Sequence, residues 1–442
     1  MADPTGSADS LGEGGSGGAV SAEGAEASGS SGAGGGEAMA LGGAAGSAHG
    51  GAGGMPSGGA AGTGDAGKVS GDGGTSPIVT PPDPCVLNGG CAPGTWVDVT
   101  PSQVNLTTGS CGNYGAESVQ VDPARPQDLY SLIMCGGIWK STNYGQTWTG
   151  QINTGTNGAA IGDCAGALRI APGKTGSPPI LYVSCIRGTG SGFWASVNGG
   201  VDFTHYNVGP AQSQQFYPPV VDPYDAQHLL MAMHGTDLLL QSTDGGQTWM
   251  AATTDPGMAG GSTYGINFIN TGDVATTRTT WLWMAAATGG KIGTWRTTNS
   301  GTAWKKVESN EHPAGVTEIY QPDTKGIVYA AGVYSSLGWG ILRSTDYGVT
   351  WVHVGQAIQE RVIVGTPRHL YSMMGGASGP GAMVDPSLEV ADQPGTGAWT
   401  KPGTPTAMTQ GPAQAVVTYD GTNSVIVAAN YNAGLWRYIE PK

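Results

Sequence analysis

Residues 242–249 of the chain read Ser-Thr-Asp-Gly-Gly-Gln-Thr-Trp, and this stretch recurs four more times in the sequence. The other copies are Ser141 to Trp148 (STNYGQTW), Ser196 to Phe203 (SVNGGVDF), Thr297 to Trp304 (TTNSGTAW) and Ser344 to Trp351 (STDYGVTW). All five share the frame Ser/Thr-x-Asp/Asn-x-Gly-x-x-aromatic. A motif that returns about every 50 residues indicates a repeat architecture.

The residue types of this frame are those of a tight turn. A Ser or Thr hydroxyl and an Asp or Asn side chain can bond the backbone of a reversal, and glycine allows the positive φ that such a reversal often needs. The aromatic residue then begins the next strand and packs between sheets. We therefore expect the repeated turn to stabilise the fold and to take no part in chemistry.

The repeat divides the chain into seven units, each ending at an aromatic residue. These residues are Trp96, Trp148, Phe203, Trp249, Trp304, Trp351 and Trp399. Trp96 begins an outer strand with no blade in front of it, whereas the last unit, from Ala415 to Tyr438, holds three strands and stops. The sequence thus predicts an all-β, seven-bladed β-propeller of four-stranded antiparallel blades, in which the N-terminal strand completes the last blade and removes an open edge.

Strands can be assigned within the units. In the first blade we expect them at 117–121, 129–134, 137–141 and from 148 onward. The sixth blade, 361–402, is the weakest, because Gln393-Pro-Gly-Thr-Gly-Ala-Trp399 stands in place of the repeated turn. Helical periodicity is nowhere convincing.

The first 77 residues differ in composition from the rest. They are dominated by Gly, Ala and Ser and contain no aromatic residue, so they cannot bury enough apolar surface to offset the entropy of ordering. We predict a disordered tether over 1–77, a disulfide-pinned lead-in over 78–95 and the propeller over 96–442.

The charge and the hydropathy of the chain argue against nucleic acid as a partner and against a membrane-spanning helix. Eight acidic residues against Lys68 give the predicted tether −7 of the chain's net −14, so the propeller region carries only the other −7. No Lys/Arg cluster is present, and we expect no nucleic-acid partner. No apolar run reaches about 18 residues, so we expect no transmembrane helix. No motif calls for a cofactor, and we expect none.

Six cysteines lie in the first half of the predicted folded region. None has metal-ligand spacing with a nearby histidine, so disulfides are favoured over a metal site. Cys111 and Cys164 precede the first strands of blades one and two, and Cys135 and Cys185 follow the second strands, which predicts the pairs 111–135 and 164–185. Cys85 and Cys91 would close the lead-in loop. Disulfides imply an extracellular or cell-surface location, yet Met1-Ala-Asp-Pro is no export signal; either the signal has been removed or the compartment differs.

The repeated frame resembles the Asp-box (BNR repeat) of the sialidase-like propellers. That superfamily includes sialidases, the sortilin ectodomain, a plant photosystem assembly factor and xyloglucan-degrading glycosidases, so the resemblance implies a fold and leaves the function open. In these families the box lies on the turn between the third and fourth strands, on the face opposite the active site.

A narrower resemblance covers the first blade. Trp96-Val-Asp-Val with residues 113–141 is similar to the opening blade of the xyloglucanase-type enzymes, but Met134 falls where that family has its catalytic Asp. Sialidases need an Arg-Ile-Pro motif, for which this chain has only Arg169-Ile-Ala-Pro. We therefore assign neither xyloglucanase nor sialidase activity to this chain.

Ligands of propellers usually bind at the mouth formed by loops that lead into first strands and loops that follow second strands. On these loops we expect the ligand-binding residues, a mixture of aromatic and polar side chains suited to a sugar. They are Tyr114, Arg187, His234, Asp237, Glu318, Tyr334 and Tyr431, with Asn432 beside the last. Catalytic residues cannot be assigned.

Two functions are compatible with this sequence. One is a secreted or surface-tethered propeller that binds a polysaccharide or a cell-envelope partner, including a cell-surface protein. The other is a glycan-cleaving enzyme, a glycoside hydrolase or polysaccharide lyase, for which two carboxyls would have to face each other. Asp163, Asp237, Glu318 and Glu360 are the candidates for such a pair. Oligomeric state is not predicted.

Overall fold

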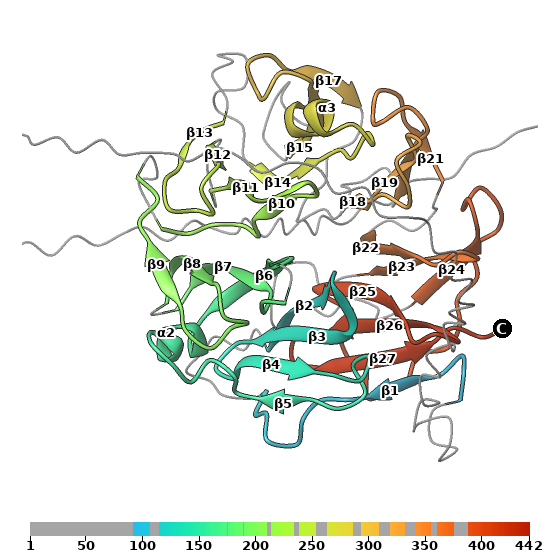
Figure 1. Ribbon diagram of the computed structural model, residues 1–442. Coiled ribbons are helices and arrows are strands. Elements are labelled where there is room, and N and C mark those ends of the chain that lie inside the picture. The colour runs from blue at the N-terminus through green and yellow to red at the C-terminus, as the bar shows by residue number, and fades with distance from the viewer. Residues whose placement is uncertain are drawn as a thin grey trace, which may run out of the picture. The chain divides into compact units, whose positions relative to one another are not determined.

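The computed structural model of the chain describes residues 92–106, 115–174, 176–188, 190–209, 214–233, 238–252, 263–285, 293–308, 319–331, 341–354, 360–374 and 388–442. All of them belong to one unit, Thr75–Lys442. Within this unit the chain forms seven antiparallel sheets, and Figure 1 shows them following one another around a ring. The predicted seven-bladed propeller is confirmed.

Each sheet is one blade, and in the first six blades the strands follow chain order from the centre outward, whereas in the seventh the first strand of the chain is outermost. Blade 1 holds β2 (Ala116–Asp122), β3 (Arg125–Ile133), β4 (Gly137–Ser141) and β5 (Thr149–Gly150); blade 2 holds β6 (Ala165–Ala171), β7 (Ile180–Arg187), β8 (Gly192–Ser196) and β9 (Thr204–Tyr206); blade 3 holds β10 (Val220–Asp222), β11 (Asp225–Ala232), β12 (Leu239–Ser242) and β13 (Met250–Ala251). Blade 4 holds β14 (Thr263–Phe268), β15 (Trp281–Ala285), β16 (Gly293–Thr297) and β17 (Lys305–Glu308); blade 5 holds β18 (Ile319–Tyr320), β19 (Val328–Ala331), β20 (Ile341–Ser344) and β21 (Val352–His353). Blade 6 holds β22 (Glu360–Gly365), β23 (His369–Met374) and β24 (Leu388–Asp392), and blade 7 holds β25 (Gln414–Tyr419), β26 (Ser424–Ala429), β27 (Leu435–Ile439) and β1 (Trp96–Asp98).

Blade 6 is the irregular one, as the missing turn motif predicts. Its sheet has three strands, and a bridge between Val390 and Thr400 takes the place of the fourth. Two short helices, α2 (Gly158–Gly162) and α3 (Val274–Thr279), lie in connecting segments. The sequence did not indicate them, because five or six residues are too few to show a helical period.

Closure of the ring joins the two ends of the folded unit. β1 pairs with β27 in antiparallel register, with Trp96 opposite Tyr438, and the N–H of Val99 donates to the carbonyl of Leu435 at 2.9 Å. Figure 1 shows β1, in blue, along the outer side of the red β27. The predicted N-terminal closure is confirmed.

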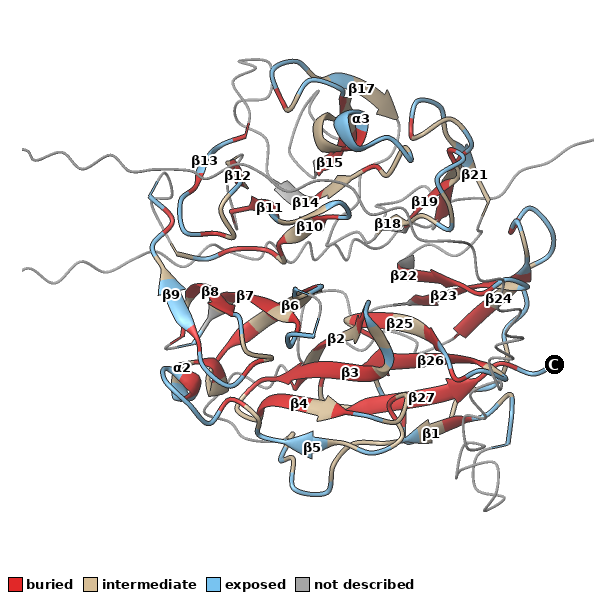
Figure 2. Cartoon of the chain, viewed as in Figure 1, coloured by how far each residue is buried: buried red, intermediate tan, exposed pale blue. Residues whose placement is uncertain are grey.

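The core lies between the blades. Strands such as β3, β26 and β27 are buried on both faces, because each blade is covered by the blade before it and the blade after it, while the outer strands β5 and β9 are largely exposed (Figure 2). This explains why the middle strands read as continuous apolar runs instead of alternating patterns.

The repeated turns share one set of hydrogen bonds. In the turn at 242–249, the Ser242 hydroxyl donates to Asp244 Oδ1 at 2.8 Å, the N–H of Gly246 donates to Ser242 Oγ at 2.8 Å, and the N–H of Thr248 donates to Asp244 Oδ1 at 2.9 Å. The same three bonds recur in the turns that begin at Ser141, Ser196, Thr297 and Ser344. The turn predicted from the sequence is confirmed.

The glycine of this turn is required both by its backbone conformation and by the lack of space for a side chain. Gly246 has φ +86°, and a Cβ there would lie 2.1 Å from Cε1 of Phe193 in blade 2. The ring of Trp249 meets Phe193 edge-on, with centroids 5.0 Å apart. The turn therefore holds neighbouring blades together as well as reversing the chain.

Removing the turn carboxylate should cost stability without altering the loops at the opposite end of the blades. We expect Asp244→Ala to lower the free energy of unfolding by about 1–2 kcal/mol, because the hydroxyl of Ser242 and the N–H and hydroxyl of Thr248 lose their acceptor. Chemical denaturation measures this. Unchanged stability would mean that water replaces the carboxylate.

Candidate functional site

The rims of the propeller differ in construction. Because antiparallel strands alternate in direction, the turns between first and second strands lie on the same rim as the repeated turns, here called the lower rim. That rim has short links such as Pro123-Ala124 between β2 and β3. The opposite, upper rim carries the connections into first strands and those after second strands. Several of the latter, 286–292, 332–340 and 375–387, lie outside the described residues.

A central channel runs between the inner strands. It encloses a cavity of about 520 Å³ whose wall takes residues from the first strands of all seven blades. The polar side chains of this wall are Gln120, Arg169, Asn267, Tyr320 and Gln414. The inner strands also turn their unpaired edges toward the axis, so backbone donors and acceptors add to the polarity of the channel.

Hydrogen bonds between blades fix the inner strands. Gln414 Oε1 accepts from the Ser118 hydroxyl at 2.7 Å and from the N–H of Val119 at 3.1 Å. The N–H of Leu168 donates to Ser118 Oγ at 3.2 Å. Blades 7, 1 and 2 are thus joined through buried polar groups next to the channel wall, which makes the wall a fixed surface.

Of the seven predicted ligand-binding residues, two lie in described segments. Arg187 is the last residue of β7, on the upper rim, although its side chain is outside the described part. Tyr431 lies in the β26–β27 connection, also on the upper rim, with φ 49°. Its side chain is buried at 7 % exposure. Tyr114, His234, Asp237, Glu318 and Tyr334 lie outside the described residues, so their roles stay predictions.

Two buried amide oxygens on the upper rim of blade 7 accept no hydrogen bond from the residues that the structure describes. Asn430 is 1 % exposed, and its Nδ2 donates to the carbonyl of Gln410 at 2.8 Å, which fixes the orientation of the amide. No residue in the described ranges donates to its Oδ1 or to the buried Oδ1 of Asn432. The N–H of Asn432 donates to Gln410 Oε1 at 3.2 Å. Sequence reasoning missed Asn430 and Gln410, for which the only signal was the turn-like Asn-Tyr-Asn-Ala-Gly.

The upper ends of three inner strands break register at equivalent positions. The break falls between Ala116 and Ser118 in β2, between Thr263 and Gly265 in β14, and between Glu360 and Val362 in β22. At the first of these, Glu117 Oε2 accepts from the N–H of Gly166 in blade 2 at 2.6 Å. Bulges of this kind re-aim side chains and occur often beside binding sites.

Carboxyl groups of the repeated turns serve the fold. The N–H of Thr156 and the side chain of Asn198 lower the pKa of Asp202. For Asp244 burial alone would raise the pKa, but hydrogen bonds from Thr248 and Ser242 outweigh burial and lower it. The pKa of Asp346 is lowered in the same way. These groups stay ionised as acceptors within turns, opposite in behaviour to a general acid, whose pKa is raised.

The pairing of Cys164 with Cys185 is confirmed. The disulfide lies on the upper rim, where it joins the segment before β6 to β7. Cys135 is also disulfide-bonded, while Cys111, Cys85 and Cys91 lie outside the described residues.

No group of three or more His, Cys, Asp or Glu side chains that could hold a metal ion occurs within the described ranges. In the same ranges, no helix has the length and apolar character needed to cross a membrane.

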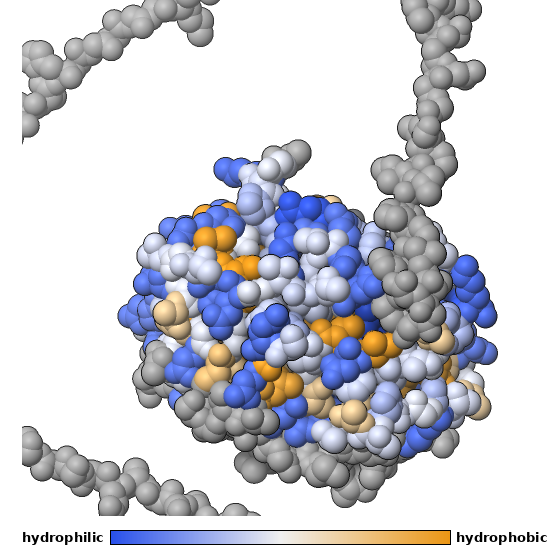
Figure 3. Space-filling model, turned by 90° about the horizontal axis from the view of Figure 1, so that it is seen from below, coloured by the Kyte–Doolittle hydropathy of each residue, from blue (hydrophilic) through white to orange (hydrophobic). Residues whose placement is uncertain are grey.

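On the face that Figure 3 shows, hydrophobic residues gather in small patches separated by hydrophilic ones.

No protein-family model and no curated protein matches this chain. Among solved structures, YCF48 bound to D1 peptide is similar at 13% identity and a TM-score of 0.53, over 78% of this chain and 97% of that one. YCF48 from Cyanidioschyzon merolae is 11% identical, with a TM-score of 0.48, over 78% and 99% of the two chains. An ancestral GH74 enzyme is 15% identical, with a TM-score of 0.47, over 72% of this chain and 44% of that one. At such identities the likeness to the YCF48 complex concerns the fold alone.

Proposed function

We propose that this chain is a binding propeller that takes a polysaccharide of the cell envelope or its surroundings on the loops of its upper rim. The lower rim is occupied by hydrogen-bonded turns that hold the blades, which leaves the upper rim as the face that can vary. Propeller function of this kind resides in loops carried by a rigid ring. The predicted residues Arg187, His234, Asp237, Tyr334, Tyr114, Glu318 and Tyr431 belong to this proposed surface.

The observation that supports a hydroxyl-bearing ligand best is the pair of amide oxygens at Asn430 and Asn432. A buried acceptor without a donor costs about 1–3 kcal/mol, and the orientation of Asn430 is fixed by its bond to Gln410. No described residue donates to either oxygen. A sugar hydroxyl is the donor that would satisfy them at the proposed face, and burial would strengthen the bond.

The location proposed for the protein is extracellular. The Cys164–Cys185 disulfide is the kind of bond that persists in oxidising compartments. The Gly/Ala/Ser-rich residues 1–77 would then act as a tether that holds the Asp-box propeller away from a surface. A cell-envelope protein in place of a polysaccharide would use the same upper loops.

Glycan cleavage is the alternative activity for the same face. It needs an opposed pair of carboxyls, and of the four candidates Asp237 and Glu318 lie outside the described residues, as does the side chain of Glu360. The two activities differ in an observable way, since cleavage releases new reducing ends and binding does not.

The test is retention on immobilised plant, algal and bacterial polysaccharides, with reducing ends assayed in parallel. For the retained polysaccharide we expect Asn432→Ala to weaken binding about tenfold, the worth of one buried hydrogen bond, with no loss of stability. Gln247→Ala, which removes an exposed amide from the lower rim, is the matched control and should bind normally.

Three results would contradict the proposal. They are retention of no polysaccharide, equal binding by the Asn432 variant, and release of reducing ends in step with binding. The last would establish the glycan-cleaving alternative.

A further inference from the structure

The loop between β26 and β27 is held in place by backbone hydrogen bonds. The N–H of Tyr431 donates to the carbonyl of Ala116 in blade 1 at 2.8 Å, and the N–H of Ala116 donates to the carbonyl of Tyr431 at 2.9 Å. Within the loop, the N–H of Asn430 donates to the carbonyl of Gly434 at 2.8 Å. Binding groups carried by a loop that is fixed in this way are oriented before a ligand arrives.

Gln410 orients both asparagines of this loop. Its backbone carbonyl accepts from Asn430 Nδ2 at 2.8 Å, and its side-chain Oε1 accepts from the N–H of Asn432 at 3.2 Å. Gln410 belongs to the connection that leads into β25, so two upper-rim segments of blade 7 meet at these bonds. The Oδ1 atoms of Asn430 and Asn432, here called the acceptor pair, are buried and receive no hydrogen bond from the described residues.

The acceptor pair is uncharged, and so are the groups of Gln410 that orient it. Glu117, which follows Ala116 on β2, adds a carboxylate to the same rim. Its Oε2 accepts from the N–H of Gly166 in blade 2 at 2.6 Å, and an ionised carboxylate has no donor to offer. A ligand at the acceptor pair therefore has to bring the donor itself.

A charge on a sugar unit is unfavourable at the acceptor pair, whatever its sign. A carboxylate or sulfate has acceptors only, so it would face two further acceptors in a buried contact. An ammonium group has donors, but its burial beside uncharged oxygens leaves its loss of hydration uncompensated. A hydroxyl or an amide N–H supplies the donor without bringing a charge.

We propose that the acceptor pair is a subsite for an uncharged sugar unit, one that presents a hydroxyl or an N-acetyl N–H and carries no carboxylate, sulfate or ammonium group, and that Gln410 is its positioning residue. The subsite lies on the proposed polysaccharide-binding face, so this assignment rests on the proposed function. The preference arises at the two oxygens themselves and is independent of charges elsewhere on the rim.

The test measures the affinity of the full chain for the polysaccharide retained in the screen, and for the same preparation after oxidation of its primary hydroxyls to carboxylates. Both are measured at raised salt concentration, which screens charges far from the site. We expect oxidation to weaken binding by at least about tenfold, the worth of one buried hydrogen bond. A polysaccharide that is acidic as isolated is compared with its carboxyl-reduced form, which should bind more tightly by the same factor.

Two substitutions at Asn432 locate the effect. Asn432→Ala removes one oxygen of the acceptor pair and should reduce the difference between the two preparations to about threefold or less. Asn432→Asp keeps an acceptor and adds a negative charge, so the oxidised preparation should bind at least about tenfold more weakly than it does to the wild type, with the unoxidised one within about threefold. Gln247→Ala on the lower rim is the matched control and should leave both affinities unchanged.

Substitution of Gln410 tests its positioning role. Gln410→Met removes the oxygen that accepts from the N–H of Asn432, whereas Gln410→Glu keeps an oxygen there. We expect the Met variant to bind the unoxidised preparation about tenfold more weakly than the wild type and the Glu variant to recover most of that affinity, with the folding of both checked by chemical denaturation. Equal affinity of the two variants would show that Gln410 does not position the acceptor pair.

Retention of no polysaccharide would overturn the proposed function and this subsite with it. Binding that is equal or tighter after oxidation would overturn the subsite alone and leave polysaccharide binding intact. A difference between the two preparations that persists unchanged in Asn432→Ala would also overturn the subsite, because the discrimination would then arise elsewhere on the rim.

Discussion

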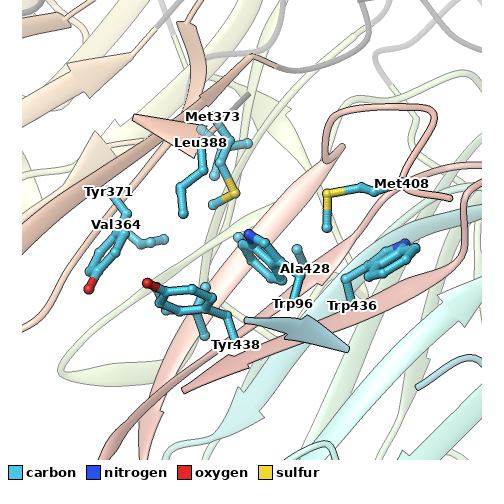
Figure 4. Packing of buried hydrophobic residues seen from close by; sticks show 12 residues of the cluster. Trp96, Val364, Tyr371, Met373, Leu388, Met408, Ala428, Trp436 and Tyr438 are labelled. Carbon is cyan, nitrogen blue, oxygen red and sulfur yellow. The ribbon is translucent and has the colours of Figure 1, made fainter. Parts of the chain in front are cut away.

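Trp96→Ala is expected to lower the free energy of unfolding by about 3–5 kcal/mol, the cost of deleting a fully buried aromatic side chain. Trp96 is 4 % exposed and lies against Tyr438, with ring centroids 5.2 Å apart. Figure 4 shows its indole among Tyr438, Ala428, Met373 and Met408. Within the part of the chain that the structure describes, the indole N–H has no hydrogen-bond partner, so the loss is one of packing.

The position of Trp96 makes this loss global. β1 is the strand that closes the ring, and removing its anchor exposes the edge of β27 to water. We therefore expect one cooperative transition at lower denaturant concentration, followed by circular dichroism. Val97→Ala on the same strand, where the side chain is only half-buried, is the control and should cost far less. Equal effects of the two changes would show that β1 stabilises the ring through backbone pairing alone and that the buried side chain of Trp96 does not anchor it.

Glu440→Gln is expected to cost about 3 kcal/mol or more at neutral pH, as breaking a buried charged network does. Glu440 is 4 % exposed, and its Oε1 accepts from the Thr366 hydroxyl at 2.6 Å, from His369 Nδ1 at 2.7 Å and from the Tyr371 hydroxyl at 3.0 Å. All three donors belong to blade 6, so this carboxylate ties the end of the last strand to the neighbouring blade.

The same group predicts a pH dependence. Burial alone would raise the pKa of Glu440, but the hydrogen bonds from Thr366, His369 and Tyr371 outweigh burial and lower it. A folded-state pKa below the unfolded value of about 4.3 stabilises the protein at higher pH, and this contribution is lost as the pH falls through the folded-state pKa. Wild-type stability should therefore decline below about pH 5, and more steeply than that of the Gln variant.

Asp392→Asn serves as the control for this prediction. Asp392 contacts the other nitrogen of His369, Nε2, at 3.3 Å, but its side chain is 93 % exposed, and exposed pairs contribute little. Its effect should be small at every pH. If the Asn variant loses as much stability as the Gln variant, His369 and not Glu440 is the centre of the network.

The repeated turns could be predicted because they are local. Every bond in the turn at Ser242 joins residues within a few positions of one another. The local amino-acid sequence is therefore enough to specify the structure of the turn. Ring closure followed from counting strands at the two ends. The Cys164–Cys185 pair followed from the position of both cysteines relative to strands of one blade.

The candidate sites could be predicted only in part. Sequence placed Arg187, Tyr431 and Asn432 on upper-rim loops, but nothing in it distinguishes an amide oxygen that finds a donor from one that does not. Asn430 became notable only because Gln410, in a different connection, fixes its orientation. The bulges at the upper ends of β2, β14 and β22 depend on pairing with a partner strand, and a pattern along one strand does not reveal them.

The sequence by itself determined the all-β propeller, its seven blades, its closure and one disulfide, because turn chemistry and strand alternation act over a few residues. Tertiary structure decided what faces the axis. Gln414 meets Ser118 across 296 positions and Glu440 meets Thr366 across 74, and Arg169, which in the sequence is only part of an imperfect motif, comes to line the central channel. Such groupings arise when the ring closes, since only then do inner strands from all seven blades surround one space.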